Sequence, residues 1–517
     1  MLAQLMQPNE GGNERDTLGG GGGSSFFAIL ITSWLAAREG LEIMMKRISL
    51  LSLSFIFLMG MVVSQSATAQ DTKPLTPEEL ANRTVYRRAV DAVIWGVPIV
   101  SLDMMRQAYF RDGKAEYNDI IWWPKGATWK NQSLATNTIV RYIYFFSNTK
   151  KNGPVVFELP PAVAGAAGFY GTIMDAWQVP LTDVGVGGKG GKYLLLPPDY
   201  KGELPSGYIP MRLKTYNSYT LIRSILASNS EEDVRKGDAL VNKIKVYPLN
   251  QAGSPPKQRF IDMTDIVYEP AVPYDSGFYV SLSRMINEEP AQAKDMEMLG
   301  MLLPLGIEKG KTFDPDSATR ATLNTAAAEA HAWLLDGIAR VVVPWWPGEH
   351  WAIPSAPIGV KTTFLWEMPN YFDVDGRGIT LADWFGPVSK LGGSSFYLAA
   401  YFDSTGAPLQ GGNNYKLHVS ANVPVKQFWS ITVYDMATSA LFRDADRLVV
   451  SSTDKGVQKN SDGSVDVYFG PKPPAGKEAN WVYTQEGKNW FPWFRFYGPG
   501  KAAEDKSWKM PDIEKVD

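Results

Sequence analysis

The chain of 517 residues contains no cysteine, and this absence constrains both its fold and its chemistry. Disulfides, thiolate nucleophiles and cysteine-ligated metals are all excluded. A chain of this length can nevertheless bury a stable core without disulfides. Seventeen tryptophans, sixteen of them beyond residue 69, supply apolar surface that suits either a thick core or a ligand-stacking wall. Any catalysis is therefore limited to carboxylate, histidine, tyrosine or oxygen-ligand metal chemistry.

The first 69 residues have the pattern of a leader. Lys46-Arg47 precedes an apolar run over 48–63, and Ala67-Thr68-Ala69 follows, as in a secretory signal peptide. The run is short for a membrane span, which needs about 20 apolar residues. We therefore predict a signal peptide over 44–69, cleavage after it, and a periplasmic chain with no membrane span. An uncleaved anchor is the alternative.

Residues 1–43 fit neither leader nor domain, and we interpret them as a mis-set translation start or a disordered extension. Removal of residues 1–69 leaves 448 residues with 47 Lys and Arg against 49 Asp and Glu. With no basic surplus, nucleic acid is not an expected partner. A small-molecule ligand and a homo-oligomer remain open.

In the rest of the chain, sequence patterns typical of helices alternate with patterns typical of strands. A capping pattern at Thr76-Pro77 opens a predicted helix over 76–111. A second helix begins at Asp316 or Ser317, with one apolar face formed by Leu323, Ala327, Ala330 and Leu334. Short apolar runs bounded by Gly and Pro predict strands elsewhere. We predict a mainly β fold in three parts: an N-terminal β-sandwich with a leading helix (76–229), a helical region (230–343) and a C-terminal jelly roll (344–517).

The C-terminal strands carry an unusual polar face. Their apolar residues alternate, as in Trp429, Ile431 and Val433. The opposite faces carry Lys416 and His418; Ser430, Thr432 and Tyr434; Asp466 and Tyr468; and Trp493, Arg495 and Tyr497. If these strands are neighbours in one sheet, they form a wall on which rings stack and Arg495 binds a carboxylate. The alternative is an interface buried between domains, because interfaces also enrich Tyr, Trp and Arg.

Three residues are weak catalytic candidates. Asp175 is predicted to share a buried face with Ile173 and Trp177, and a buried carboxylate needs a partner or a raised pKa. We expect Arg141 or Arg223 as that partner, so a structural ion pair competes with a general acid. Asp466 and His418 are the other candidates.

Other motifs do not carry a cofactor or metal site. The glycine-rich stretch 185–192 lacks the Gly-Lys-Ser/Thr register of a phosphate loop. The stretch 373–378 lacks the distal glutamate of a calcium loop, so a turn is the interpretation. His331, His350 and His418 show no zinc-ligand spacing. We predict no cofactor and no metal.

Several ordered motifs resemble a two-part bacterial family catalogued as domains of unknown function 1254 and 1214. The N-terminal resemblance rests on Trp129-Lys130-Asn131-Gln132, Asn137-Thr138 with Arg141-Tyr142, and Asp175-Ala176-Trp177. The C-terminal resemblance rests on Phe428-Trp429-Ser430, Asp462-Gly463-Ser464 and Arg495-Phe496-Tyr497-Gly498-Pro499. The resemblance implies an immunoglobulin-like sandwich, a helical segment and a jelly roll. It implies no activity and no catalytic residue.

The leading hypothesis is a periplasmic protein that binds a small organic or sugar-like molecule. The expected site residues are Arg495, Trp493, Tyr497, Tyr434 and Tyr468. One alternative is a hydrolase or lyase that uses Asp175, Asp466 or His418 as acid or base. Another is a scaffold without a ligand site. A pocket between the two β-rich parts would favour the leading hypothesis.

Overall fold

The computed structural model describes residues 74–228, 230–341, 343–354, 364–384, 395–445 and 447–517. The predicted signal peptide and the segment 1–43 lie outside the described residues. Residues Thr76–Asp517 form one unit.

The N-terminal strands form a six-stranded and a four-stranded sheet among the described residues. The strands are β1 (Ile120–Trp122), β2 (Arg141–Asn148), β3 (Val155–Leu159), β4 (Ala167–Asp175), β5 (Pro180–Val184), β6 (Gly191–Leu196), β7 (Ile209–Arg212), β8 (Asn217–Leu226), β9 (Lys245–Pro248) and β10 (Phe260–Asp262). The larger sheet has the order β10-β1-β2-β8-β4-β5 and the smaller the order β7-β6-β3-β9. Along β2, Ile143 and Phe145 pack into one core while Tyr142 and Tyr144 pack into another. Both faces of the larger sheet are therefore buried.

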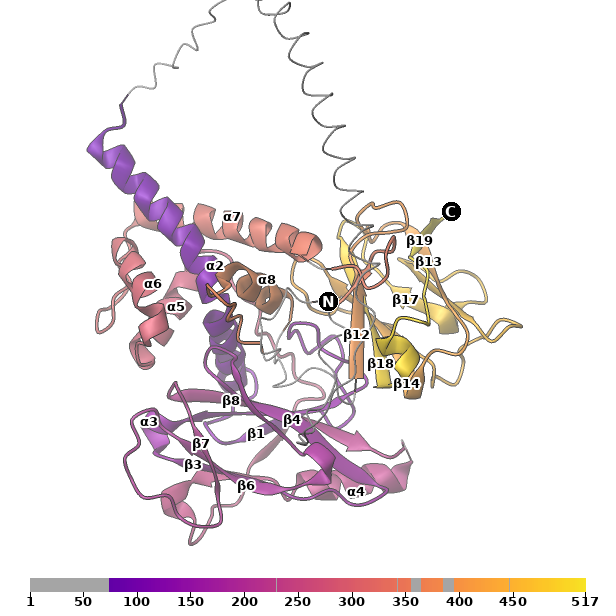
Figure 1. Ribbon diagram of the computed structural model, residues 1–517, viewed down its shortest axis with the longest axis horizontal. Helices are drawn as coiled ribbons and strands as arrows, with labels where there is room; N and C mark the ends of the chain where they lie inside the picture. The colour runs from indigo at the N-terminus through magenta and orange to yellow at the C-terminus, as the bar shows by residue number, and fades with distance from the viewer. Residues whose placement is uncertain (1–73, 229, 342, 355–363, 385–394, 446) are drawn as a thin grey trace, which may run out of the picture. The chain divides into compact units, whose positions relative to one another are not determined.

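Three helices pack against one long helix, α2 (Pro77–Arg111). The other described α-helices are α3 (Thr149–Asn152), α4 (Glu231–Val241), α5 (Ser276–Glu288), α6 (Met296–Met301), α7 (Ser317–Val341), α8 (Val374–Asp383) and α9 (Lys501–Glu504). The predicted cap of α2 is confirmed, because Thr76 and Glu79 form a reciprocal capping box. Helix α2 contacts α5, α7 and α8 (Figure 1).

Two sequence predictions about helices have different outcomes. The face of α7 formed by Leu323, Ala327, Ala330 and Leu334 is fully buried, as predicted. The predicted turn at 373–378 is instead the start of α8, where the Asp373 side chain accepts a hydrogen bond from the amide of Gly376. The same Asp that suits a turn also suits a helix N-cap, so local composition did not separate the two.

The C-terminal strands also form two sheets among the described residues. They are β11 (Trp351–Ala352), β12 (Ser395–Ala400), β13 (Asn414–Val419), β14 (Val425–Asp435), β15 (Val449–Ser451), β16 (Val465–Gly470), β17 (Trp481–Tyr483), β18 (Trp490–Pro499) and β19 (Glu514–Val516). One sheet has the order β11-β12-β18-β14-β15, and the other has the order β17-β16-β13-β19 (Figure 1).

The four polar faces therefore do not lie in one sheet, and the condition for a single wall is met only by β14 and β18. Strands β14 and β18 pair with each other, whereas β13 and β16 pair in the second sheet. Alternation along a strand determines which residues share its face, but not which strand lies beside it.

A single hydrophobic cluster includes residues from all three predicted parts. Trp95, Tyr144, Leu282, Leu334 and Trp493 all belong to it. The three boundaries given above remain a prediction. Within the described ranges, no helix is long and apolar enough to cross a membrane.

Candidate ligand-binding cavity

One face of the β14–β18 pair gathers the aromatic and polar residues that alternate along these strands. Antiparallel register places Ser430 opposite Arg495 and Thr432 opposite Trp493. On the other side of β18, β12 places Tyr397 opposite Arg495. Residues directly opposite each other share a face of the sheet, so these side chains form one continuous surface.

The loop over 131–137 covers this surface. The carbonyl of Ala135 accepts hydrogen bonds from Arg495 Nη2 at 3.2 Å and from the Tyr434 hydroxyl at 3.3 Å. The Ala135 amide donates to the carbonyl of Ser439 at 2.7 Å, and Asn137 Nδ2 donates to the Tyr497 hydroxyl at 2.5 Å. Ala135 has a positive φ of 45°, a strained conformation for a residue with a Cβ. The surrounding hydrogen bonds stabilise this strained backbone conformation. Strained residues of this kind are concentrated at functional sites.

The larger N-terminal sheet supplies the opposite wall. Between these surfaces lies a cavity of about 30 Å³. Its described lining residues are Ser133, Leu134, Ala135, Thr136, Asn137, Tyr142, Tyr144, Leu221, Arg223, Trp384, Tyr397, Trp493 and Arg495. A space of this size exceeds what one water molecule needs. The two strand-rich parts therefore enclose a polar cavity between them.

Arg495 is the central charge of the cavity. It is 1% exposed, and its Nη2 donates to Tyr434 at 2.6 Å while its Nη1 has no hydrogen-bond partner. The guanidinium carbon lies 5.0 Å from the Trp493 ring centroid, within cation–π range. Burial lowers the pKa of Arg495 and the tyrosines around it raise it, with a net rise. The cavity thus contains a buried cation with a free donor.

Arg223 is the second charge. It reaches the cavity from β8 and lies over the ring of Tyr142, with 5.9 Å between its guanidinium carbon and the ring centroid. Within the part of the chain that the structure describes, neither Arg223 nor Arg495 forms an ion pair with a carboxylate. Two arginines without carboxylate partners favour an anion.

The predicted ligand-binding residues are only partly brought together. Arg495, Trp493 and Tyr434 lie at or beside the cavity and are buried, as the interface alternative expects. Tyr497 lies on the same face, stacked on Phe428 with ring centroids 4.2 Å apart. Tyr468 is on β16 in the other sheet, opposite Lys416, and is not part of the cavity lining.

Several lining residues were missed or misassigned from the sequence. The sequence indicates Arg223 only as a partner for Asp175, and it does not indicate Tyr142, Trp384 or Tyr397 as site residues. The available signal is that Arg223, a charged residue, alternates with the apolar Leu221 and Tyr219 along one strand. That signal does not reveal the sheet that faces it.

The catalytic candidates lie in separate places. His418 Nδ1 and Asp466 Oδ1 are 2.7 Å apart across the β13–β16 pair. They are 43% and 24% exposed at their side chains, so they form a partly exposed pair outside the cavity lining.

Asp175 is 1% exposed, but its predicted neighbours are wrong. Its Oδ1 accepts the backbone amides of Trp177 at 2.8 Å and Val179 at 3.0 Å. Burial raises its pKa, and the two amides oppose that rise. Because β4 ends at Asp175 after a bulge, Ile173 and Trp177 pack into different cores.

The two arginines expected to pair with Asp175 have other surroundings. Arg141 pairs with Asp238 and donates from Nε to the carbonyl of Pro124 at 2.6 Å. Arg223 lines the cavity. Strand pairing explains this outcome, because β4 places Asp175 opposite Ser218 and Tyr170 opposite Arg223.

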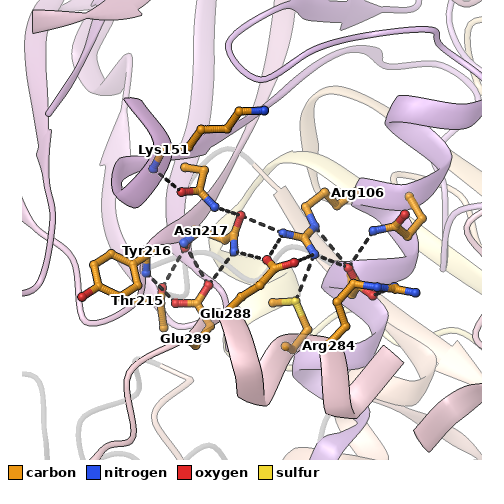
Figure 2. A network of polar contacts seen from close by, with 12 residues as sticks. Arg106, Lys151, Thr215, Tyr216, Asn217, Arg284, Glu288 and Glu289 are labelled. Carbon is orange, nitrogen blue, oxygen red and sulfur yellow. Dashed lines mark hydrogen bonds and ion pairs between the residues drawn. The ribbon is translucent and has the colours of Figure 1, made fainter. Parts of the chain in front are cut away.

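A polar network fixes β8 to the helices (Figure 2). Arg106 of α2 contacts Asp103 at 2.6 Å, Asn217 at 2.9 Å and Glu288 at 2.5 Å. Glu289 accepts the backbone amide of Asn217 at 2.9 Å, and burial raises its pKa to about 7. Asp103 and Glu288 pair with Arg106, and the Glu289 carboxylate accepts hydrogen bonds from two backbone amides and Asn217, so we interpret the network as structural. It anchors the first residue of the strand that carries Arg223.

No group of three or more histidine, aspartate or glutamate residues in the described ranges is placed to hold a metal ion.

Comparison with known proteins identifies the family but not an activity. Residues 117–248 match the family model DUF1254 and residues 394–501 match DUF1214, both described as proteins of unknown function. No curated protein matches the chain.

Two solved structures are similar to this chain. The VPA0106 protein from Vibrio parahaemolyticus is 18% identical over 84% of this chain and 100% of its own, with a TM-score of 0.49. An uncharacterised protein from Burkholderia cenocepacia is 13% identical over 84% and 95%, with a TM-score of 0.36.

Sheets and cavity define a β-rich protein in which two strand-rich regions meet around a polar space. The two matched segments correspond to the two parts, DUF1254 and DUF1214, of the family that the motifs resemble, which confirms that resemblance.

Proposed function

We propose that this protein binds a small organic acid, whose carboxylate occupies the cavity beside Arg495. The observation that carries the proposal is Arg495, a buried guanidinium that lines a polar cavity, has no carboxylate partner among the described residues, and has an Nη1 without a hydrogen-bond partner. A buried unpaired charge is costly, and a carboxylate offsets that cost through charge-assisted hydrogen bonds.

The size of the cavity separates an organic acid from a sugar-like ligand. A space of about 30 Å³ accommodates a carboxylate group but is far below the roughly 300 Å³ of a typical small-molecule pocket. Trp493 is packed against Tyr397, with centroids 5.8 Å apart in a stacked arrangement, and against Trp384. Its ring is therefore engaged with protein rings, which disfavours Trp493 as a sugar platform.

Isothermal titration calorimetry on the purified protein tests this function. A panel of formate, acetate and short dicarboxylates should give saturable binding that Arg495→Gln weakens at least tenfold. Arg340→Gln is the control, because Arg340 forms an exposed pair with Asp336 on α7. Equal binding by the wild-type protein and Arg495→Gln would place the site elsewhere and overturn the proposal.

We also propose a cellular location for the protein and a fold class for each of its two β-rich regions. The leader pattern supports export to the periplasm with cleavage after Ala69. The two pairs of sheets support an immunoglobulin-like sandwich followed by a jelly roll. N-terminal sequencing of the protein from a periplasmic fraction tests the first point, since a retained leader would contradict it.

A hydrolase or lyase is the second candidate, and the His418–Asp466 pair is the observation that favours it. A carboxylate on Nδ1 orients an imidazole so that Nε2 can act as a base. The pair is absent from the described lining of the cavity. Turnover lost in His418→Asn but kept in Arg495→Gln would favour this candidate over binding.

A further inference from the structure

The cavity carries two positive charges that come from different sheets. Arg223 belongs to β8 of the larger N-terminal sheet, and Arg495 belongs to β18 of the C-terminal sheet. They are the charged members of the described lining, whose other residues are neutral. A monocarboxylate bound there would balance one of the two charges.

Two carboxylates on segments next to the cavity, Asp383 and Asp183, accept hydrogen bonds from hydroxyl groups. Asp383 precedes the lining residue Trp384 and accepts hydrogen bonds from Ser439 at 2.9 Å and Tyr401 at 3.1 Å. Burial raises its pKa to about 7, which weakens it further as a counter-charge. Asp183 accepts hydrogen bonds from the hydroxyls of Thr172 at 2.9 Å and Tyr170 at 3.4 Å.

Each arginine has a distinct role toward a ligand. Arg495 is held by Tyr434 and Ala135 and has one free buried nitrogen. Arg223 makes no hydrogen bond to another described residue and packs on Tyr142, so its fork remains available for a carboxylate. One carboxylate group can therefore be bound from each sheet.

We propose that the ligand is a small dianion, a short dicarboxylate of about the size of oxalate or malonate, clamped between Arg223 and Arg495. This assignment rests on the proposed function and specifies the charge of its ligand. Charge complementarity supports it, because two carboxylates neutralise two arginines that have no acidic partner in the described lining. The small volume favours the shortest diacids.

Calorimetry with matched ligands tests the clamp in the full chain. Malonate should bind the wild-type protein at least tenfold more tightly than its monoamide malonamate, which has the same number of heavy atoms and one charge. Arg223→Gln should remove this preference. Arg223→Lys, which retains the charge, should keep most of the preference. Arg495→Gln should weaken both ligands.

The outcomes separate the two proposals. Equal affinity of wild-type protein for malonate and malonamate overturns the clamp and leaves carboxylate binding intact. Binding of neither ligand, nor of formate and acetate, overturns the proposed function. Sulfate or inorganic phosphate bound more tightly than malonate or oxalate overturns the dicarboxylate assignment. Thermal unfolding of each variant in the absence of ligand identifies any loss of affinity that comes from misfolding.

Discussion

Arg495 on β18 donates a hydrogen bond of 2.6 Å to the hydroxyl of Tyr434 on the neighbouring strand β14. The same hydroxyl donates to the carbonyl of Thr136 at 2.7 Å. Tyr434 thereby connects the guanidinium to the loop that covers it. Burial raises the pKa of Tyr434 to about 12, so its hydroxyl keeps its proton at neutral pH.

Tyr434→Phe removes both hydrogen bonds without changing the size of the ring. A hydrogen bond to a charged group contributes roughly 1.5–3 kcal/mol, so we expect the free energy of unfolding to fall by about 2 kcal/mol. Urea denaturation measures this loss, and ligand affinity should fall with it because Arg495 loses its orientation. Unchanged stability would mean that Arg495 does not depend on Tyr434.

Ala135 should tolerate glycine but not a β-branched residue. Its positive φ is strained for any residue with a Cβ and most strained for valine. Ala135→Val should destabilise the protein by more than about 1 kcal/mol, whereas Ala135→Gly should stay within roughly 1 kcal/mol of wild type. Urea midpoints of the two variants provide the measurement. Equal midpoints would show that the loop adapts to both residues.

Asp383 should make stability depend on pH. Burial raises its pKa from 3.8 to about 7, so folding disfavours the charged form. Its contribution to stability is therefore complete below pH 3.8 and is lost as the pH rises toward 7, by roughly 2–4 kcal/mol. Glu289 acts in the same direction, because burial raises its pKa to about 7.

Asp383→Asn isolates the contribution of Asp383. Its two hydrogen-bond partners are the hydroxyls of Ser439 and Tyr401, which can rotate to suit an amide. Between pH 4 and 7.5, unfolding by urea should show a shallower loss of stability in the variant than in the wild-type protein. Parallel curves would assign the pH dependence to other groups.

Arg106→Gln should be the most destabilising of these changes. It leaves Asp103 and Glu288 without their shared cation, and Asp103 has a fully buried side chain. Breaking a buried ion pair costs about 3–5 kcal/mol, and Arg284, which also contacts Asp103, offsets part of it. Arg340→Gln, at an exposed pair, should change stability by less than about 1 kcal/mol in the same assay. A similar effect of both substitutions would contradict the structural role of the network.

Local sequence patterns predicted local features well. Thr76 and Glu79 form the capping box that residues 76–79 indicate, and the apolar face of α7 is buried. Alternation along β14 and β18 correctly grouped Tyr434 with Thr432, and Trp493 with Arg495, because side chains alternate between the faces of any strand.

Features that depend on distant segments could not be predicted in this way. Tyr468 and His418 lie in a different sheet from Arg495, which alternation cannot reveal because strand pairing is decided across long sequence separations. The sequence does not link Arg223 to Arg495, because the residues of one strand do not indicate which strand faces it across the cavity. The pairing of Asp175 with Arg141 failed because the strand ends at Asp175 and the next turn supplies its own amides.

The loop over 131–137 makes its defining contacts with residues that are translated much later. Its bonds to Tyr434 and to Arg495 and Tyr497 join positions 298 and 360 residues apart in the chain. Contacts of such separation form late, because the entropy of closing the intervening chain must be overcome first. The cavity therefore cannot form before β18 is in place. A chain cut before β18 would lack the binding site even where its N-terminal sheets fold, and occupancy by a ligand would report that the whole chain has folded.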